Sequence, residues 1–216
     1  DIKNPEVSVI LPCRNEEEAI GQCIMDIQKV FPEQKILGEI IVSDSSTDGT
    51  AEIAKQLGAI VIRHGKEGYG IACIEGFAAA RGKYMLLADA DGSYDFYEIP
   101  KFLKELKKGA DMVIGNRFSG NIKKGAMPLT HKYIGNPVLS FLLRLFFGAK
   151  VRDVHCGMRA ISQRAYQRLT LHTTGMEFAS EMVMQAVKHN LHIREIPVNY
   201  YQRLGKSKLK TIYDGW

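Results

Sequence analysis

Two aspartates one residue apart, Asp89 and Asp91, directly follow the apolar run at residues 84–88. Side chains at positions i and i+2 of an extended strand point to the same side, so both carboxylates can reach one cation. Mg²⁺ and Mn²⁺ take such oxygen ligands and commonly bind together with a nucleotide diphosphate. The alternative is a solvated turn after a strand, which is a common setting for a lone Asp-x-Asp motif.

Two more polar loops follow predicted strands, at residues 12–16 and 43–50. In a doubly wound sheet the loops at the carboxyl ends of parallel strands lie side by side. Acidic side chains in these two loops could accept hydrogen bonds from a base and a ribose while the aspartate pair holds the metal. Taken singly, the loops have a plainer explanation, because Asn15, Thr47 and Asp48 are good helix caps. The three loops together favour a nucleotide site at one edge of the sheet.

Short apolar strands alternate with helices through the first half of the chain. The spacing of apolar residues predicts strands at 7–11, 40–42, 59–62, 84–88 and 112–114 and helices at 17–30, 48–58 and 71–81. We expect Pro12 to end the first strand, Asp48 to cap the second helix and Gly58 to lie just past its end. This alternation predicts an α/β fold with a Rossmann-like, mostly parallel sheet flanked by helices on both faces.

The second half of the chain has a different pattern. It predicts a polar, glycine-rich segment, an apolar helix, a further helix and a last strand, at 115–128, 137–147, 177–189 and 193–198. A length of 216 residues suits one domain. We therefore expect a single domain over residues 1–216, with a nucleotide-sugar-binding half at about 1–115 and an acceptor-binding half at 116–216.

Charge and cysteine content restrict the partners and the compartment. A net charge of +5 favours anionic partners such as nucleotide diphosphates, lipid phosphates or an anionic membrane surface, and is too small to argue for nucleic acid alone. The four cysteines have no C-x-x-C spacing, which is typical of reduced thiols in the cytosol rather than of a zinc site.

The relation to a membrane is left open by the sequence. No uninterrupted apolar segment reaches the roughly 20 residues that a membrane span needs, although a membrane region could follow residue 216. The apolar helix at 137–147 could pack in the core, which is the usual role of such a stripe, or lie in the headgroup layer and bring a lipid to the site.

Four motifs, in their order and spacing, resemble the family 2 glycosyltransferases of the GT-A fold. They are Val-Ile-Leu-Pro-x-x-Asn-Glu at 9–16, Asp-x-Ser-x-Asp-Gly-Thr at 44–50, Asp-Ala-Asp at 89–91 and Ile-Gly-Asn-Arg-Phe at 114–118. Within that family the chain resembles polyprenyl-phosphate sugar synthases, which make dolichyl-phosphate glucose or mannose. This resemblance extends over almost the whole chain and includes Arg-Asp-x-x-Cys-Gly at 152–157 and Arg-x-Gly-x-Ser-Lys-Leu at 203–209.

The resemblance implies a role for each matching residue. The metal would be held by Asp89 and Asp91, and the predicted catalytic residues are Asp91, Arg117 and Lys208. The remaining substrate contacts fall into three groups: Pro12, Asn15, Glu16, Val42 and Asp44 around the nucleoside; Ala90 and Ser93 beside the aspartates at the diphosphate; and Arg117, Arg203 and Lys208 at the leaving diphosphate or the acceptor phosphate. A family arginine for the lipid phosphate aligns with His131, and Lys132 adjoins it.

The predicted reaction is an inverting, metal-dependent transfer of a hexose from a nucleotide diphosphate sugar to a polyprenyl or dolichyl phosphate, giving a β-linked product. A lipid phosphomonoester is ionised near pH 7, its second pKa being about 6, so no strong general base is needed. The residues at 92–96, Gly-Ser-Tyr-Asp-Phe, are similar to glucose synthases and favour UDP-glucose, with GDP-mannose as the alternative. Such an enzyme would work at the cytoplasmic face of a membrane.

Two other classes of protein are alternatives. A sugar-nucleotidylyltransferase would carry a glycine-rich, arginine-containing loop after its first strand, which residues 12–16 are not. A non-catalytic nucleotide-binding module at a membrane surface is the other alternative. The segment at 65–70 contains three glycines but no Walker ending, and we expect a flexible loop near the donor. The oligomeric state, the lipid length and the choice between Mg²⁺ and Mn²⁺ are not fixed by the sequence.

Overall fold

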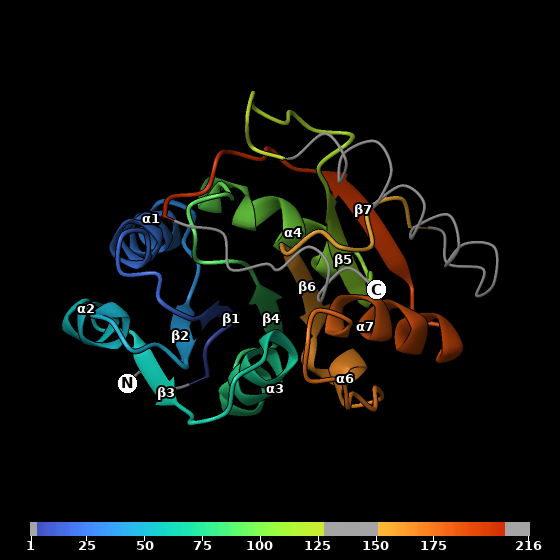
Figure 1. Ribbon diagram of the computed structural model, residues 1–216. Coiled ribbons are helices and arrows are strands. Elements are labelled where there is room, and N and C mark those ends of the chain that lie inside the picture. Colours follow the sequence, from blue (N-terminus) through green and yellow to red (C-terminus); the bar gives the residue numbers. More distant parts are fainter. Residues whose placement is uncertain (1–3, 128–150, 206–216) are drawn as a thin grey trace.

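A seven-stranded sheet forms the centre of the protein in the computed structural model, which describes residues 4–127 and 151–205 (Figure 1). The strands lie in the order β3-β2-β1-β4-β6-β5-β7. Strand β6 runs antiparallel to both of its neighbours, whereas the other pairs are parallel. The bounds are β1 Val7–Cys13, β2 Gly38–Asp44, β3 Ile60–Arg63, β4 Tyr84–Leu87, β5 Met112–Asn116, β6 Arg159–Ser162 and β7 Ile193–Pro197.

Helices cover both faces of this sheet. Figure 1 has α1 and α4 on one face and α3, α6 and α7 on the other. The bounds are α1 Ile20–Glu33, α2 Thr50–Gln56, α3 Tyr69–Ala79, α4 Ile99–Lys107, α6 Gln163–Tyr166 and α7 Phe178–Lys188, with a 3-10 turn η1 at Phe96–Glu98. The predicted α/β architecture, with a mostly parallel sheet between two helical layers, is confirmed.

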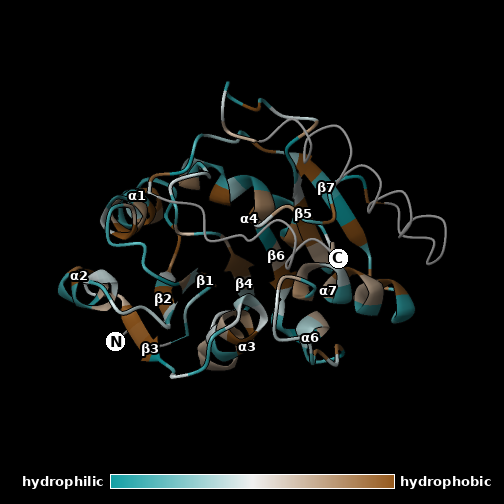
Figure 2. Cartoon of the chain, in the orientation of Figure 1, coloured by the Kyte–Doolittle hydropathy of each residue, from teal (hydrophilic) through white to brown (hydrophobic). Residues whose placement is uncertain are grey.

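The central strands are buried along their whole length, because helices cover them on both sides. Every residue of β1, β2 and β4 is buried, and β4 is mostly hydrophobic (brown in Figure 2). Helix α1 turns one apolar side to the core, where Ile20, Ile24 and Ile27 are fully buried. The spacing of apolar residues in the sequence therefore predicted the strands and the helix α1 that support the loops at the carboxyl ends of the strands.

The expectation that Pro12 ends the first strand is wrong, since β1 continues to Cys13. The carbonyl of Ile10 accepts a hydrogen bond from Ala88, so the polar backbone groups of Ile10, and of Pro12 two residues later, face β4. Pairing with β4 stops at Leu87, opposite Ile10. The missing N–H of Pro12 thus costs no bond of the ladder.

Helix α2 is shorter than the predicted 48–58, and its N-cap is Gly49 rather than the expected Asp48. Asp48 lies before the helix, and its Oδ1 accepts a hydrogen bond from the backbone N–H of Thr50 at 3.0 Å. Gly58 follows the last turn with φ +81°, the left-handed conformation that favours glycine there. The apolar helix predicted at 137–147 lies outside the described residues.

Strand β6 and helix α4 were not predicted from the sequence, nor were the short helix α6 and the 3-10 turn η1. Strand β6 consists of Arg-Ala-Ile-Ser, and its first residue, Arg159, is a fully buried cation. Helix α4 is amphipathic, with Ile99, Phe102, Leu103 and Leu106 buried. No helix within residues 4–127 and 151–205 combines the length and the hydropathy that crossing a bilayer would need.

Candidate active site

Three polar loops meet at the carboxyl edge of the sheet, where β1, β2 and β4 end. Because these strands are parallel, their following loops must leave from the same edge. The last residue of β1, Cys13, is paired with Asp44, the last residue of β2. One residue, Ala88, separates the end of β4 from the aspartate pair. The sheet therefore brings together the loops that the sequence predicts to surround a nucleotide.

The first two loops are tied to each other by side chains. The backbone N–H of Asn15 donates to Ser46 Oγ at 2.7 Å, and the N–H of Thr47 donates to Asn15 Oδ1 at 2.8 Å. Asn15 has φ 55°, a left-handed conformation that asparagine tolerates better than most residues. Asn15 therefore shapes the site by joining two loops, and its contact with substrate stays a prediction.

Asp44 is completely buried at the end of β2. Its Oδ1 accepts from the N–H of Ser46 at 3.2 Å, whereas Oδ2 lies 3.5 Å from Arg63 Nε and has no hydrogen-bond partner in the described structure. A buried carboxylate oxygen without a donor is costly, so an N–H group of a bound base would satisfy it. Pro12 and Val42, which are also predicted at the nucleoside, are buried near the ends of β1 and β2, and their contact with substrate stays a prediction.

Asp91 is held by a residue of its own loop after β4, whereas Asp89 is held by a residue of α3. Asp91 is buried, and its Oδ1 accepts from both the N–H and the hydroxyl of Ser93. Asp89 Oδ1 accepts from the hydroxyl of Tyr69 at 3.3 Å. Ala90 between them is buried. Ser93 therefore orients Asp91, and its predicted contact with the diphosphate stays a prediction.

The charge of Asp89 is disfavoured by its surroundings. Burial raises the pKa of Asp89 to about 6, and repulsion from Asp91 adds to the rise, while the guanidinium groups of Arg117 and Arg159 oppose it. A divalent cation between the two carboxylates would remove this penalty by favouring the ionised form.

The donor set suits a metal that arrives with a nucleotide. Within residues 4–127 and 151–205 no group of three or more His, Cys, Asp or Glu side chains is placed to hold a metal ion. Mg²⁺ and Mn²⁺ in nucleotide sites usually take one or two carboxylates and complete their shell with phosphate oxygens and water. Asp89 and Asp91 fit that arrangement, whereas a site made of protein ligands alone would need more of them.

Arg203 reaches the site from near the end of the described chain. Its Nη2 donates to Glu16 Oε1 at 3.2 Å, and its Nη1 lies 3.6 Å from Asp91 Oδ2. The backbone is fixed as well, because the N–H of Leu204 donates to the carbonyl of Asp91 at 2.8 Å and that of Tyr201 to Ser93 at 2.9 Å. The structure therefore brings Arg203 to the predicted diphosphate position.

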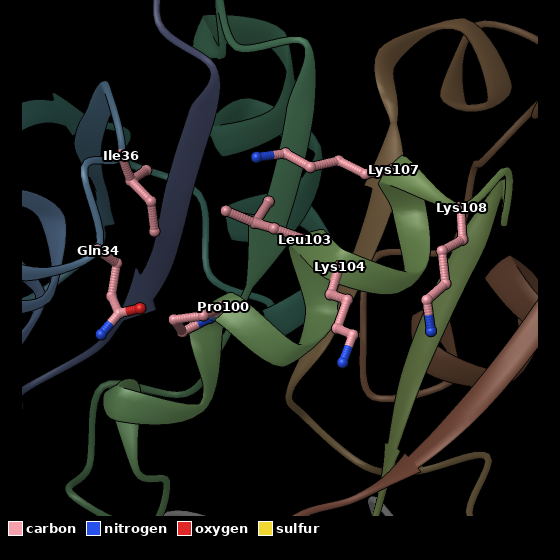
Figure 3. A pocket seen from close by; sticks show the side chains of 7 residues that line it. All are labelled: Gln34, Ile36, Pro100, Leu103, Lys104, Lys107 and Lys108. Atoms are coloured by element: carbon pink, nitrogen blue, oxygen red, sulfur yellow. The ribbon is translucent and has the colours of Figure 1, made fainter.

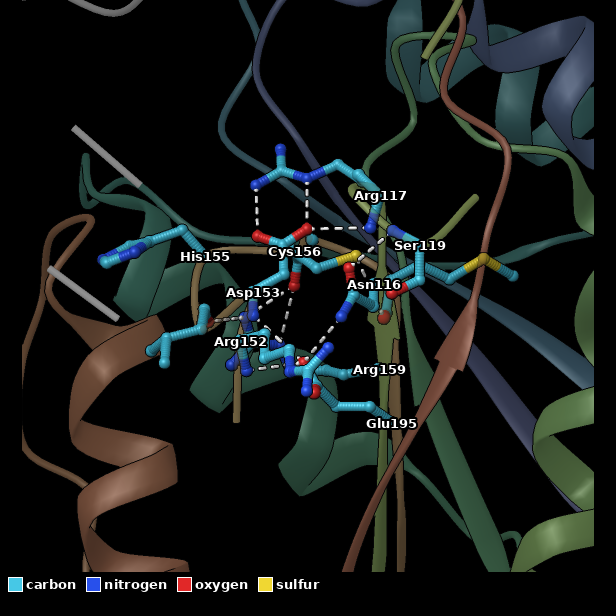
Figure 4. Close-up of polar contacts among 12 residues, drawn as sticks. Asn116, Arg117, Ser119, Arg152, Asp153, His155, Cys156, Arg159 and Glu195 are labelled. Carbon is cyan, nitrogen blue, oxygen red and sulfur yellow. Dashed lines mark hydrogen bonds and ion pairs between the residues drawn. The ribbon is translucent and has the colours of Figure 1, made fainter. Parts of the chain in front are cut away.

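Arg117 follows β5 and is buried against Asp153 (Figure 4). Its Nε and Nη2 each donate to this carboxylate at 2.8 Å, and its backbone N–H does so at 2.9 Å. The guanidinium also lies over the ring of Tyr200, 5.1 Å from the centroid. Glu195 on β7 accepts from the N–H of Asp153 at 3.0 Å. Asp153 belongs to the motif at 152–157, but the sequence did not predict that it holds Arg117.

Three predicted site residues, His131, Lys132 and Lys208, lie outside the described residues. Of the residues predicted to bind the leaving diphosphate or the acceptor phosphate, Arg117 and Arg203 lie within the described residues. A separate surface cavity of about 340 Å³ lies at the opposite end of the strands, before β2 and before β5 (Figure 3). It is lined by Gln34, Ile36, Pro100, Leu103, Lys104, Lys107 and Lys108 and takes no part in this site.

Comparison with known proteins connects this geometry to a family. Residues 8–170 match the model described as glycosyl transferase family 2. A dolichyl-phosphate hexose transferase of Haloferax volcanii is 32% identical over 216 residues, which cover 97% of this chain and 89% of the relative. The low-salt glycan biosynthesis hexosyltransferase Agl6 of the same organism is 46% identical over 213 residues, 98% of this chain, and the chain spans 52% of that relative's length.

Solved structures give the fold. Mannosyl-3-phosphoglycerate synthase from Rubrobacter xylanophilus superposes with a TM-score of 0.77 at 20% identity, covering 94% of this chain and 68% of that one. Glucosyl-3-phosphoglycerate synthase from Mycobacterium tuberculosis, crystallised with Mn²⁺, UDP and glucosyl-3-phosphoglycerate, gives 0.74 at 23% identity and covers 94% and 73%. The fold is that of the GT-A glycosyltransferases. The chain belongs to glycosyl transferase family 2, as its motifs predict.

Proposed function

We propose that this protein transfers a hexose from a nucleotide diphosphate sugar to a polyprenyl or dolichyl phosphate, with inversion at the anomeric carbon. The observation that carries the proposal is the aspartate pair at the end of β4, at the same sheet edge as the buried, unsatisfied oxygen of Asp44. A nucleotide diphosphate has an N–H-bearing base at one end and charged phosphates at the other. Asp44 Oδ2 suits the base, and the aspartate pair, through a metal, suits the phosphates.

The leaving group is a nucleoside diphosphate, whose negative charge grows as the sugar departs. A divalent ion held by Asp89 and Asp91 would supply positive charge to these phosphates. Arg203 is placed to add a second cation, because its Nη1 lies 3.6 Å from Asp91. A cation fixed before the reaction needs little reorganisation as charge develops, which favours the transition state over the ground state.

The chemistry of the acceptor supports a lipid phosphate. An alcohol acceptor would need a base to remove its proton, whereas a phosphomonoester with a second pKa of about 6 attacks as an anion. A relative that is 32% identical is named a dolichyl-phosphate hexose transferase, which supports this choice.

We assign UDP-glucose as the donor, with GDP-mannose as the alternative. Asp44 Oδ2 would accept the N–H of a uracil or a guanine, so the geometry alone suits both bases. The segment at 92–96 favours glucose through its similarity to glucose synthases. Either Mg²⁺ or Mn²⁺ would serve, and Mn²⁺ accompanies UDP in a structural neighbour. The net charge of +5 and a lipid acceptor favour work at the cytoplasmic face of an anionic membrane.

Radiolabelled sugar transfer tests the proposal. The protein is incubated with labelled UDP-glucose or GDP-mannose, polyprenyl phosphate and Mn²⁺, and label is counted in the organic phase. We expect metal-dependent label from UDP-glucose and none without the lipid phosphate. A parallel reaction offers 3-phosphoglycerate, the acceptor type of the structural neighbours. Transfer to that compound and not to the lipid would overturn the proposed acceptor.

A further inference from the structure

We propose that Tyr69 is a positioning residue for Asp89, and that Asp89 is clamped between the Tyr69 hydroxyl and the backbone of Gly157. The inference rests on the proposed function, in which Asp89 holds the metal and the diphosphate. Tyr69 belongs to the glycine-containing segment at 65–70, for which the sequence predicts a flexible loop near the donor. In the structure, the end of this segment begins helix α3, and Tyr69 contacts Asp89.

The tyrosine side of the clamp is anchored in the core. Tyr69 is the first residue of α3, and its ring packs edge-on against Phe178 of α7, with centroids 6.4 Å apart. From there its hydroxyl donates to Asp89 Oδ1 at 3.3 Å. Since the ring is held between two helices, the hydroxyl occupies a position that does not depend on the loop carrying the aspartates.

The glycines around Tyr69 permit close packing with a second backbone segment. A Cβ on Gly68 would lie 2.3 Å from the carbonyl oxygen of Thr174, and one on Gly70 would lie 2.2 Å from that of Thr173. Glu181 of α7 fixes this second segment by accepting from the N–H of Thr173 at 2.9 Å. The glycines therefore serve to seat the start of α3 against the segment before α7, which fixes Tyr69.

The opposite side of Asp89 is a glycine backbone. A Cβ at position 157 would lie 2.1 Å from Asp89 Oδ2, so only glycine leaves room for the carboxylate. The N–H of Gly157 donates to the hydroxyl of the buried Tyr94 at 2.7 Å. Tyr94 in turn packs edge-on against Tyr200, with centroids 5.2 Å apart. This side is therefore held by an aromatic pair.

A buried arginine stiffens the loop before Gly157. Arg159 is almost completely buried, and its guanidinium donates to three carbonyls, those of Val154, Cys156 and Ala179. The carbonyl of Ala179 belongs to α7, which also carries Phe178 and Glu181. Helix α7 thus supports both sides of the clamp, and Asp89 is held ready before any metal arrives.

Removing only the hydroxyl of Tyr69 tests the clamp. Outer partners of metal ligands typically contribute 10–100-fold in metal affinity, so Tyr69→Phe should weaken Mn²⁺ binding to the protein–UDP complex about tenfold. Binding of UDP in EDTA should stay unchanged, because Tyr69 acts through Asp89. Free Mn²⁺ is measured by electron paramagnetic resonance and UDP binding by calorimetry. Tyr69→Phe should also lower the apparent Mn²⁺ affinity in transfer assays more than the rate at saturating metal.

Tyr166→Phe is the matched control. Tyr166 stacks on Phe77 at 4.5 Å, and Phe77 packs on the same Phe178 that holds Tyr69, so the same atom is removed from the same aromatic cluster. This control should bind Mn²⁺ like the unaltered protein. Equal Mn²⁺ affinities for the two variants would overturn the clamp, and so would an equal loss of UDP binding in EDTA for Tyr69→Phe.

Asp91→Ala separates failure of the clamp from failure of the proposed function. If Asp91→Ala abolishes Mn²⁺ binding to the UDP complex while Tyr69→Phe has no effect, only the clamp is wrong. If Asp91→Ala binds Mn²⁺ and UDP normally, the metal site of the proposed function is wrong, and the clamp fails with it. Gly157→Ala tests the other side: it should reduce Mn²⁺ affinity in a protein with an unchanged circular dichroism spectrum.

Discussion

The guanidinium of Arg203 lies 3.6 Å from Asp91 Oδ2, and the same side chain donates to Glu16 at 3.2 Å. One cation from late in the chain therefore joins the loop after β1 to the loop after β4. It lies beside the carboxylate to which we assign a metal. In the proposed site, Arg203 and a metal would compete for Asp91 without nucleotide, whereas with nucleotide bound both would face the diphosphate.

Substitution of Arg203 should therefore have two opposite effects. Arg203→Ala should lower kcat/KM for transfer about 100-fold, because it removes a cation from the leaving diphosphate. The same change should tighten Mn²⁺ binding in the absence of nucleotide, because Asp91 loses its competitor. Initial rates and Mn²⁺ titrations measure the two effects. Arg164→Ala is the control, because α6 lies at the opposite end of the strands from the site. Weaker metal binding by Arg203→Ala in the absence of nucleotide would contradict the competition for Asp91.

Loss of Asp91 should abolish transfer and spare the fold. In the described structure the Asp91 side chain accepts from Ser93 and lies near Arg203, so Asp91→Ala should lower the free energy of unfolding by about 1–3 kcal/mol, the cost of leaving buried donors without an acceptor. Asp95→Ala is a suitable control, because it also removes an aspartate that accepts a backbone hydrogen bond close by. Asp95 caps η1 by accepting from the N–H of Tyr97. Near-normal, metal-dependent transfer by Asp91→Ala would move the metal site elsewhere.

Much of the fold and the position of the site follow from the sequence. Strands β1, β2 and β4 are buried on both faces and therefore appear as continuous apolar runs. Because parallel strands end at one edge, the three polar loops had to meet. Helix α4 was missed although its buried residues Ile99, Phe102, Leu103 and Leu106 have readable helical spacing.

The remaining features depend on tertiary contacts that no local pattern encodes. Strand β6 has only two apolar residues and starts with Arg159, whose charge is accommodated by carbonyls from elsewhere in the fold. Its insertion between β4 and β5 breaks the parallel order. Asp153 finds Arg117 and Tyr69 finds Asp89 only after the sheet has assembled. The sequence predicted which residues carry charge at the site but not which neighbours hold them.

The pair of Arg117 and Asp153 should contribute to stability as well as to catalysis. Both side chains are buried, so removing one leaves an unpaired buried charge, which typically costs 3–5 kcal/mol. We expect Arg117→Ala and Asp153→Ala each to lower the free energy of unfolding by about that much. The double variant should lose less than the sum, as urea unfolding would measure.

The double variant also separates the two roles of Arg117. If Arg117 binds a phosphate during transfer, activity should stay low in the double variant even where stability is recovered. Recovery of transfer in parallel with stability would mean that Arg117 acts only by supporting the fold.

Asp44 should determine nucleoside affinity without affecting the metal. Asp44→Asn keeps the shape of the side chain but turns one acceptor oxygen into an N–H donor, which would face the N–H of the base. We expect UDP binding to weaken by at least tenfold, corresponding to about 1.4 kcal/mol. Affinity for Mn²⁺ in the absence of nucleotide should not change. Undiminished UDP binding, measured by calorimetry, would place the base away from the end of β2.

Metal binding and stability should depend on pH in opposite ways through Asp89. Burial raises the pKa of Asp89 from 3.8 to about 6, so between these values the folded protein holds a proton that the unfolded chain has lost. Without metal, stability therefore falls as pH rises through this window and levels off above about 6.

Metal binding needs the ionised carboxylate of Asp89, so Mn²⁺ affinity should rise as pH rises through the same window, by roughly tenfold for one pH unit below the pKa. Thermal unfolding and Mn²⁺ titration of the UDP complex at several pH values, with Asp89→Asn as the control, measure both trends. An affinity for Mn²⁺ that stays flat below pH 6 would mean that Asp89 is ionised throughout and that its surroundings do not disfavour its charge.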